Sequence, residues 1–284
     1  MGHTVYSMSA RTVRAKAMDY DHKAFDDIFV QNKEHRIHKE MNPNGITFRE
    51  SCDSKEHPFT TPIQFYLDVT GSMGTIPHEM IKSGLPTLIG SLLQNGVPDV
   101  VLMFAGIGDH ECDRAPLQVA QFESGDAELD MWLERLWIEG NGGGNAGESY
   151  LLAWYFAAFH TKTDAFEKRG QKGFVFTIGD EPCLPNLPMS AVKQIMGSSA
   201  VGQKNYTREE LLEKAQEKNH VYHIFLTHNG RIDHDGSWAQ MLGKNLIVLN
   251  DHALVSKTIS DTILSHSEIV HTVPVTAEEV PHLL

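Results

Sequence analysis

The sequence predicts an α/β fold of three layers, in which helices cover both faces of a mostly parallel six-stranded sheet. From Thr61 onward, short apolar runs alternate with longer segments of helical periodicity, a succession typical of a parallel sheet wrapped by helices. The chain has 284 residues, of which 41% are hydrophobic, and this is enough apolar material for a sizeable core. We therefore expect one large folded domain.

Six apolar runs of strand length predict the sheet. They cover residues 62–68, 99–107, 117–122, 173–179, 220–226 and 245–249. Residues 108–116 are too few to form the helical crossover that joins parallel strands. The second and third strands should therefore be antiparallel neighbours, with the third strand at one edge of an otherwise parallel sheet.

Helices are expected between the strands. Thr75 and Pro77 mark a helix start, and apolar residues then recur at helical spacing as far as Gly96, with a kink at Pro86. A capping box beginning at Thr207 opens a later helix. Further helical segments are expected over residues 129–137 and 150–160 and from residue 251 onward.

Composition divides the chain into three segments. Residues 1–58 are polar and irregular and contain the turn signal Asn42-Pro43-Asn44-Gly45, so they are expected to form an arm or cap. Residues 59–270 should form the α/β domain, and residues 271–284 a C-terminal tail.

Charge and cysteine content restrict the partners and the location. With 24 basic and 37 acidic residues the formal charge is −13, which disfavours a nucleic-acid partner because such binding depends on basic side chains. No apolar run approaches the roughly 20 residues that cross a bilayer, so a membrane partner is not expected. Cys52, Cys112 and Cys183 form no CxxC pattern, and no signal segment is visible at the N-terminus. A cytoplasmic location is expected.

The most informative motif is Asp68-Val69-Thr70-Gly71-Ser72, which follows an apolar strand and precedes a helix. One carboxylate and two hydroxyls on a tight turn supply part of the oxygen shell that Mg²⁺ prefers. The alternative is a turn in which a hydroxyl only caps the following helix.

A second acid, Asp180, follows the strand 173–179. Because parallel strands end at the same edge of a sheet, Asp68 and Asp180 are expected to face one ion.

A glycine-rich loop, Gly140 to Ser149, is the third feature. Its glycines satisfy GxGxxG, but the preceding segment has helical periodicity, whereas the dinucleotide fingerprint needs a strand. The loop is interpreted as bringing Asn145, Glu148 or Ser149 to the metal as a further oxygen ligand. The alternative is a loop that only provides a tight helix entry.

These three features, in this order, resemble the von Willebrand factor A (VWA) domain and its metal-ion-dependent adhesion site (MIDAS). The family pattern is D-x-S-x-S, then a threonine in a later loop, then an aspartate after the fourth strand. Asp68, Thr70 and Ser72 match the first element and Asp180 the last. The loop threonine is missing: Asn145 is its nearest positional match and Glu148 a substitute. The resemblance covers roughly residues 60–270.

The resemblance implies a Rossmann-like fold and a divalent-cation-dependent protein-interaction module. Mg²⁺ is the expected ion, with Mn²⁺ or Ca²⁺ also compatible with oxygen ligands. The bound metal would accept an Asp or Glu carboxylate from a protein partner. The resemblance is closer to stand-alone bacterial and phage proteins of this type, with Arg49-Glu50-Ser51 ahead of the first strand, than to adhesive ectodomains.

The alternative function is a metal-dependent hydrolase or phosphatase that uses the same cation, with Glu181 as the available base. The residues that such an enzyme needs, a positioned base and a Lys or Arg phosphate clamp, are not evident in the sequence, so a non-enzymatic role is favoured. Asp109, Glu111 and Asp113 alternate like a cation loop, but the later glycine and glutamate of an EF-hand are missing. A solvated hairpin turn is the favoured interpretation there.

Overall fold

The computed structural model describes residues 4–140, 147–227, 230, 232–233 and 236–266. Its main sheet has the strand order β10-β9-β6-β2-β3-β4, and only β4 runs antiparallel to its neighbour. The six strands are β2 (Thr61–Asp68), β3 (Val100–Ile107), β4 (Leu117–Val119), β6 (Gly173–Gly179), β9 (Asn219–Leu226) and β10 (Leu246–Leu249). The predicted fold class is confirmed, including the antiparallel edge strand.

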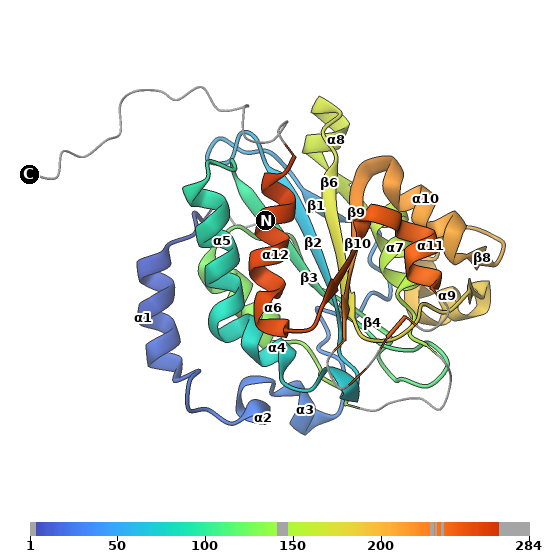
Figure 1. Cartoon of the computed structure of the whole chain (residues 1–284), viewed down its shortest axis with the longest axis horizontal. Helices are drawn as coiled ribbons and strands as arrows, with labels where there is room; N and C mark the ends of the chain where they lie inside the picture. Colours follow the sequence, from blue (N-terminus) through green and yellow to red (C-terminus); the bar gives the residue numbers. More distant parts are fainter. Residues whose placement is uncertain (1–3, 141–146, 228–229, 231, 234–235, 267–284) are drawn as a thin grey trace, which may run out of the picture.

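Helices cover both faces of this sheet (Figure 1). One face is covered by α5 (Leu85–Gln94), α6 (Asp126–Glu134) and α12 (Val255–Leu264), and the other by α7 (Leu151–Phe159), α9 (Met189–Met196), α10 (Arg208–Lys218) and α11 (Ser237–Leu242). The remaining elements include a short helix, α8 (Asp164–Arg169), and two small sheets, formed by β1 (Arg49–Ser51) with β5 (Thr161–Thr163) and by β7 (Asn186–Leu187) with β8 (Tyr206–Thr207).

The central strand β2 is buried along its whole length. Successive side chains of a strand point to opposite faces, so Phe65 packs in one core layer and Tyr66 in the other. Phe65 pairs in register with Phe104 of β3 and Phe176 of β6 and stacks on both rings, at centroid distances of 5.6 and 6.0 Å. This aromatic row packs β2 against both neighbours, one of which, β6, ends with β2 at the candidate site.

The helix expected after Thr75 is divided into three segments: α4 (Ile76–Glu79), a π-helical turn (Met80–Gly84) and α5. Pro86 lacks an N–H, and its ring crowds the carbonyl four residues earlier. The irregular turn therefore ends two residues before the proline, and Pro86 lies in the first turn of α5.

The expectation of an irregular segment over residues 1–58 was wrong for part of it. That segment contains α1 (Met8–Met18), α2 (Phe25–Ile28) and α3 (Gln31–Glu34). The Ser7 hydroxyl caps α1 by accepting from the Ala10 N–H at 3.2 Å. Arg11 is buried and pairs with Asp130 of α6 at 3.3 Å, and Figure 1 shows α1 alongside the body of the molecule. A helix that is held by a buried ion pair does not need apolar residues at helical spacing, so the sequence pattern did not reveal α1.

Two further expectations concern the C-terminal tail and membrane-spanning segments. The tail, residues 271–284, lies outside the described residues. Among the helices that are described, none is long and apolar enough to cross a bilayer.

Candidate functional site

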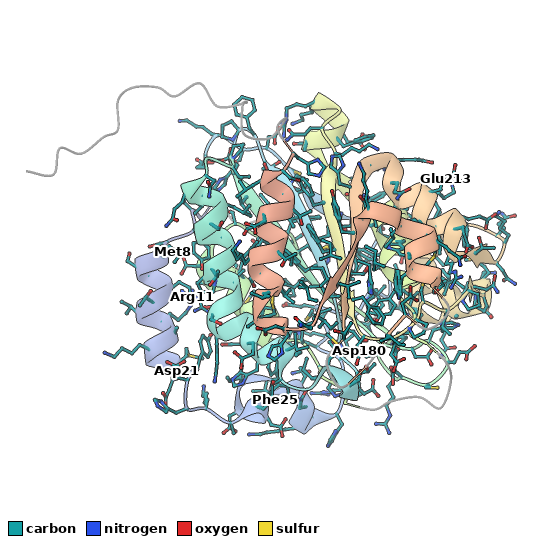
Figure 2. The ribbon with its side chains drawn as sticks, viewed as in Figure 1. Met8, Arg11, Asp21, Phe25, Asp180 and Glu213 are labelled. Atoms are coloured by element: carbon teal, nitrogen blue, oxygen red, sulfur yellow. The ribbon has the colours of Figure 1, made fainter. Side chains whose placement is uncertain are left out.

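The candidate site lies at the edge of the sheet where β2 and β6 end. Asp68 is the last residue of β2, and Asp180 directly follows β6. The two strands are parallel neighbours, and Leu67 pairs with Ile178, so both acids reach the same edge. Figure 2 shows Asp180 at this end of the strands, away from Arg11 on α1.

Hydrogen bonds, together with one close approach of two hydroxyl oxygens, connect the four residues of the first and last motif elements. Asp68 Oδ1 accepts from the Thr70 hydroxyl at 2.6 Å and from its N–H at 2.9 Å. The Thr70 and Ser72 hydroxyl oxygens lie 3.4 Å apart. Ser72 in turn donates to Asp180 Oδ1 at 2.7 Å. Two carboxylates and two hydroxyls, from the end of β2, the turn after it and the residue after β6, are thereby brought together as one group of oxygen donors.

This group is buried except at one point. Asp68, Thr70 and Asp180 are each no more than 3% exposed, whereas Ser72 is half-buried. Gly71 begins the short 3₁₀ turn that holds Ser72, and a Cβ at Gly71 would meet the Gly140 carbonyl oxygen at 2.6 Å. Solvent and any ligand therefore approach the group from the side of Ser72.

Tyr150 is a site residue that the sequence reasoning missed. Its hydroxyl donates to Asp68 Oδ2 at 2.8 Å, so both oxygens of that carboxylate are engaged. A Cβ at residue 179 would lie 1.8 Å from the Tyr150 hydroxyl oxygen, so only glycine leaves room for it. The sequence signal was a tyrosine directly after the glycine-rich loop, and nothing in that pattern distinguishes it from a core residue.

The backbone of Glu148 is hydrogen-bonded to the loop that follows β6. Its N–H donates to the Pro182 carbonyl at 2.8 Å, and its own carbonyl accepts from Leu184 at 3.0 Å. A Cβ at Gly147 would meet the Pro182 carbonyl oxygen at 2.6 Å, so this close approach needs glycine. Glu148 is 5% exposed, and within the described residues its Oε2 has no hydrogen-bond partner.

Burial changes the acidity of these carboxyls. Desolvation, reinforced by the Asp68 charge and by other nearby acids, raises the pKa of Glu148 to about 9. Desolvation also raises the pKa of Asp68, to about 6, against the opposing effect of its bonds from Thr70 and Tyr150. Asp68 remains the stronger acid because three donors stabilise its charged form, and Glu148 is the group that holds a proton at neutral pH.

The oxygen donors of this group are of the type that a hard cation prefers. In the described part of the chain, neither Asp68 nor Glu148 pairs with a lysine or arginine. Buried carboxylates without a counter-charge are costly, and a divalent ion would supply that charge. No three His, Cys, Asp or Glu side chains among the described residues are arranged to hold a metal. Any cation here would therefore depend on the Thr70 and Ser72 hydroxyls.

The remaining predicted residues have other positions. Asn145 lies outside the described residues. Ser149 is fully buried and engaged with the turn after β3: its hydroxyl accepts from the His110 N–H at 3.0 Å and lies 3.4 Å from Asp109 Oδ1. In that turn Asp109 accepts from the Glu111 N–H, and Asp113 accepts from the Asp109 N–H. These bonds within the loop agree with a turn, but the expectation of a solvated one was wrong for Asp109, which is fully buried because its carboxylate accepts from neighbouring groups.

Comparisons with known proteins give only distant matches. No protein-family model and no curated protein matches the chain. Among solved structures, the pilus adhesin SpaC from Lactobacillus rhamnosus GG in its open conformation is 10% identical, with a TM-score of 0.47, over 74% of this chain and 30% of that one. Proximal thread matrix protein 1 from the mussel byssus is 10% identical, with a TM-score of 0.49, over 75% and 49%. The chain thus spans less than half the length of either protein.

Proposed function

We propose that this chain is a VWA-type protein-interaction module whose site binds a divalent cation, Mg²⁺ by preference. Asp68, Thr70, Ser72 and Asp180 are its ligand group, and the bound ion accepts a carboxylate from a protein partner. The observation that supports this most directly is the cluster of oxygens in which Thr70 donates to Asp68, Ser72 donates to Asp180 and the two hydroxyl oxygens lie 3.4 Å apart.

The direction of those hydrogen bonds suits metal binding. A hydroxyl has one donor and two acceptor lone pairs. Thr70 and Ser72 each direct the proton at a carboxylate, which leaves oxygen lone pairs for a cation. The carboxylates are held in place by the same bonds, so little rearrangement is needed for an ion to bind.

The charge balance at the site determines how strongly a bound ion would attract a partner's carboxylate. Two carboxylates balance a divalent ion, and hydroxyl ligands leave it electrophilic toward a third carboxylate. Glu148, next to this group, is protonated at neutral pH in the absence of metal. The half-buried Ser72 marks the side from which that carboxylate enters.

A thermal-shift titration tests metal binding. EDTA-treated protein is titrated with Mg²⁺, Mn²⁺ and Ca²⁺, because an ion that binds only the native state stabilises it by about 2.7 kcal/mol at a hundredfold excess over Kd. The melting temperature of the wild type should rise, and that of Ser72→Ala should rise much less. Ser83→Ala is the matched control, because Ser83 is exposed and lies outside the ligand group. An unchanged melting temperature in wild type would refute the proposal.

Acetate is the probe for the partner carboxylate. With Mn²⁺ bound, the acetate proton signal should broaden in wild type and in Ser83→Ala but not in Ser72→Ala.

The alternative function has its own test. If Mn²⁺ promotes turnover of phosphate or ester substrates, and Asp180→Ala abolishes that turnover, the metal-dependent hydrolase becomes the better assignment. In that case Glu181, whose carbonyl accepts from the Trp238 indole at 3.1 Å, is the base to test.

A further inference from the structure

A second group of reactive side chains lies at the opposite end of the sheet from the candidate metal site. His57 precedes β2, Asp99 directly precedes β3, and Ser124 lies just before α6. Seven residue steps of β2, roughly 23 Å at the usual rise, separate this end from Asp68. No residue is shared between the two groups.

The three side chains form a serine–histidine–aspartate relay. Asp99 Oδ1 lies 3.3 Å from His57 Nδ1, and the Ser124 hydroxyl oxygen lies 3.2 Å from His57 Nε2. Asp99 is itself held by the Phe59 N–H, which donates to its other carboxylate oxygen at 2.9 Å. This is the order of contacts in which an aspartate orients a histidine and the histidine takes a serine proton.

The backbone at Asp99 adds an independent observation. Asp99 adopts a left-handed conformation, with φ of 39°, which is uncommon for a residue with a Cβ. Its carbonyl accepts from the Thr61 N–H at 3.0 Å, and its carboxylate contacts His57. The surrounding structure thus holds the aspartate in a strained conformation, as is frequent at functional sites.

The relay is covered by the N-terminal segment. The Thr4 carbonyl oxygen accepts from the Ser124 hydroxyl at 2.7 Å and lies 3.2 Å from His57 Nε2. A Cβ at Gly125 would meet the Thr4 hydroxyl oxygen at 2.0 Å, Glu128 Oε2 at 2.2 Å and the Thr4 Cβ at 2.9 Å, so a side chain at residue 125 would force Thr4 to shift. A main-chain carbonyl of the chain's own N-terminal segment therefore occupies the position next to the serine.

We propose that Ser124, His57 and Asp99 form an acyl-transfer site for extended peptides or their ester analogues, closed by the chain's own residues around Thr4. While Thr4 is in place, the Ser124 proton is directed at the Thr4 carbonyl. When it leaves, His57 Nε2 is the acceptor that remains within reach. The N-terminal segment is thus a built-in occupant that keeps the serine unreactive.

The reaction step follows from these positions. Ser124 Oγ bonds to the acyl carbon while its proton moves to His57 Nε2, and Asp99 stabilises the imidazolium through Nδ1. The C–N or C–O bond then breaks, the leaving group takes that proton, and water hydrolyses the Ser124 ester.

The test is site-specific labelling of the full chain by a fluorophosphonate, read by mass spectrometry at Ser124. Gly125→Ala, whose backbone conformation (φ −81°, ψ 144°) suits alanine, should displace Thr4 and speed labelling about tenfold or more, because it raises the population of the open state. Gly125→Val is a second, larger displacement. Ser124→Ala should show no label at that position.

His57→Gln in the Gly125→Ala background separates an activated serine from one that is merely accessible. Labelling should fall to the rate of an ordinary serine, while circular dichroism shows the same fold. EDTA should not change the rate, so failure of the metal proposal leaves this one intact. If Ser124 is unlabelled in both Gly125 variants, or if His57→Gln leaves the rate unchanged, the proposal is wrong.

Discussion

Single atoms decide the geometry of the candidate metal site. Tyr150 reaches Asp68 because residue 179 has no side chain, and Glu148 reaches the loop after β6 because residue 147 has none. These glycines are needed for space rather than for an unusual φ, which is why composition and turn rules do not reveal them.

Gly179→Ala tests this at the residue scale. The added methyl would overlap the Tyr150 hydroxyl, so the ring must move and its bond to Asp68 must break. We expect the free energy of unfolding to fall by about 2 kcal/mol or more, measured by urea denaturation. The control is Gly90→Ala in α5, where the new methyl would lie 3.7 Å from Met8 and helix propensity favours alanine. An equal loss in both variants would contradict the argument.

At the scale of elements, α1 is attached to the body of the molecule mainly by charge. Arg11 pairs with Asp130, and Arg14 pairs with both Asp126 and Asp130 at 2.6 and 3.0 Å. Arg11 and Asp130 are buried, so removing one partner leaves an incompletely compensated charge in the interior. The helix also positions the segment from Thr4 to Ser7, in which the Ser7 N–H donates to Asp126 at 3.2 Å.

Arg11→Ala should therefore destabilise the protein strongly. We expect a loss of about 3 kcal/mol in the free energy of unfolding, the size found when one member of a buried pair is removed. Hydrogen exchange should also accelerate across α1. Arg36→Ala is the control, because Arg36 pairs with Glu34 on the surface and such pairs contribute about 0.5 kcal/mol. A small effect of Arg11→Ala would show that α1 is held by other contacts.

At the scale of the whole molecule, net charge and buried acids act in the same direction. The chain has a formal charge of −13, so repulsion between its acids grows as pH rises. Glu148 adds a specific contribution. Its pKa is raised from 4.5 to about 9 in the folded state, so between these values the folded state binds more protons than the unfolded state. Stability must then decline with rising pH in this window.

Glu148→Gln isolates that contribution. In EDTA, the free energy of unfolding of the wild type should fall between pH 5 and pH 9, because the buried carboxyl must lose its proton. The variant, which keeps the shape without the titration, should show a shallower decline, and the remaining slope measures the rest of the charge. Urea denaturation at three pH values is sufficient. Parallel slopes in the two proteins would show that Glu148 titrates normally.

The sequence by itself determined the order of the six strands of the main sheet along the chain, the antiparallel edge strand and the capping box at Thr207. It also indicated which two strands would bring Asp68 and Asp180 to one edge. These features follow from apolar periodicity, from connection length and from local hydrogen bonds, all of which are written in neighbouring residues.

Only the tertiary structure decided the rest. The contacts of Tyr150 with Asp68, of Arg11 with Asp130 and of Thr4 with Ser124 join residues 82, 119 and 120 positions apart. Such contacts involve single polar side chains or one carbonyl, which leave no periodic pattern. Packing across the whole domain decides which of these residues meet, and local sequence patterns do not reveal that packing.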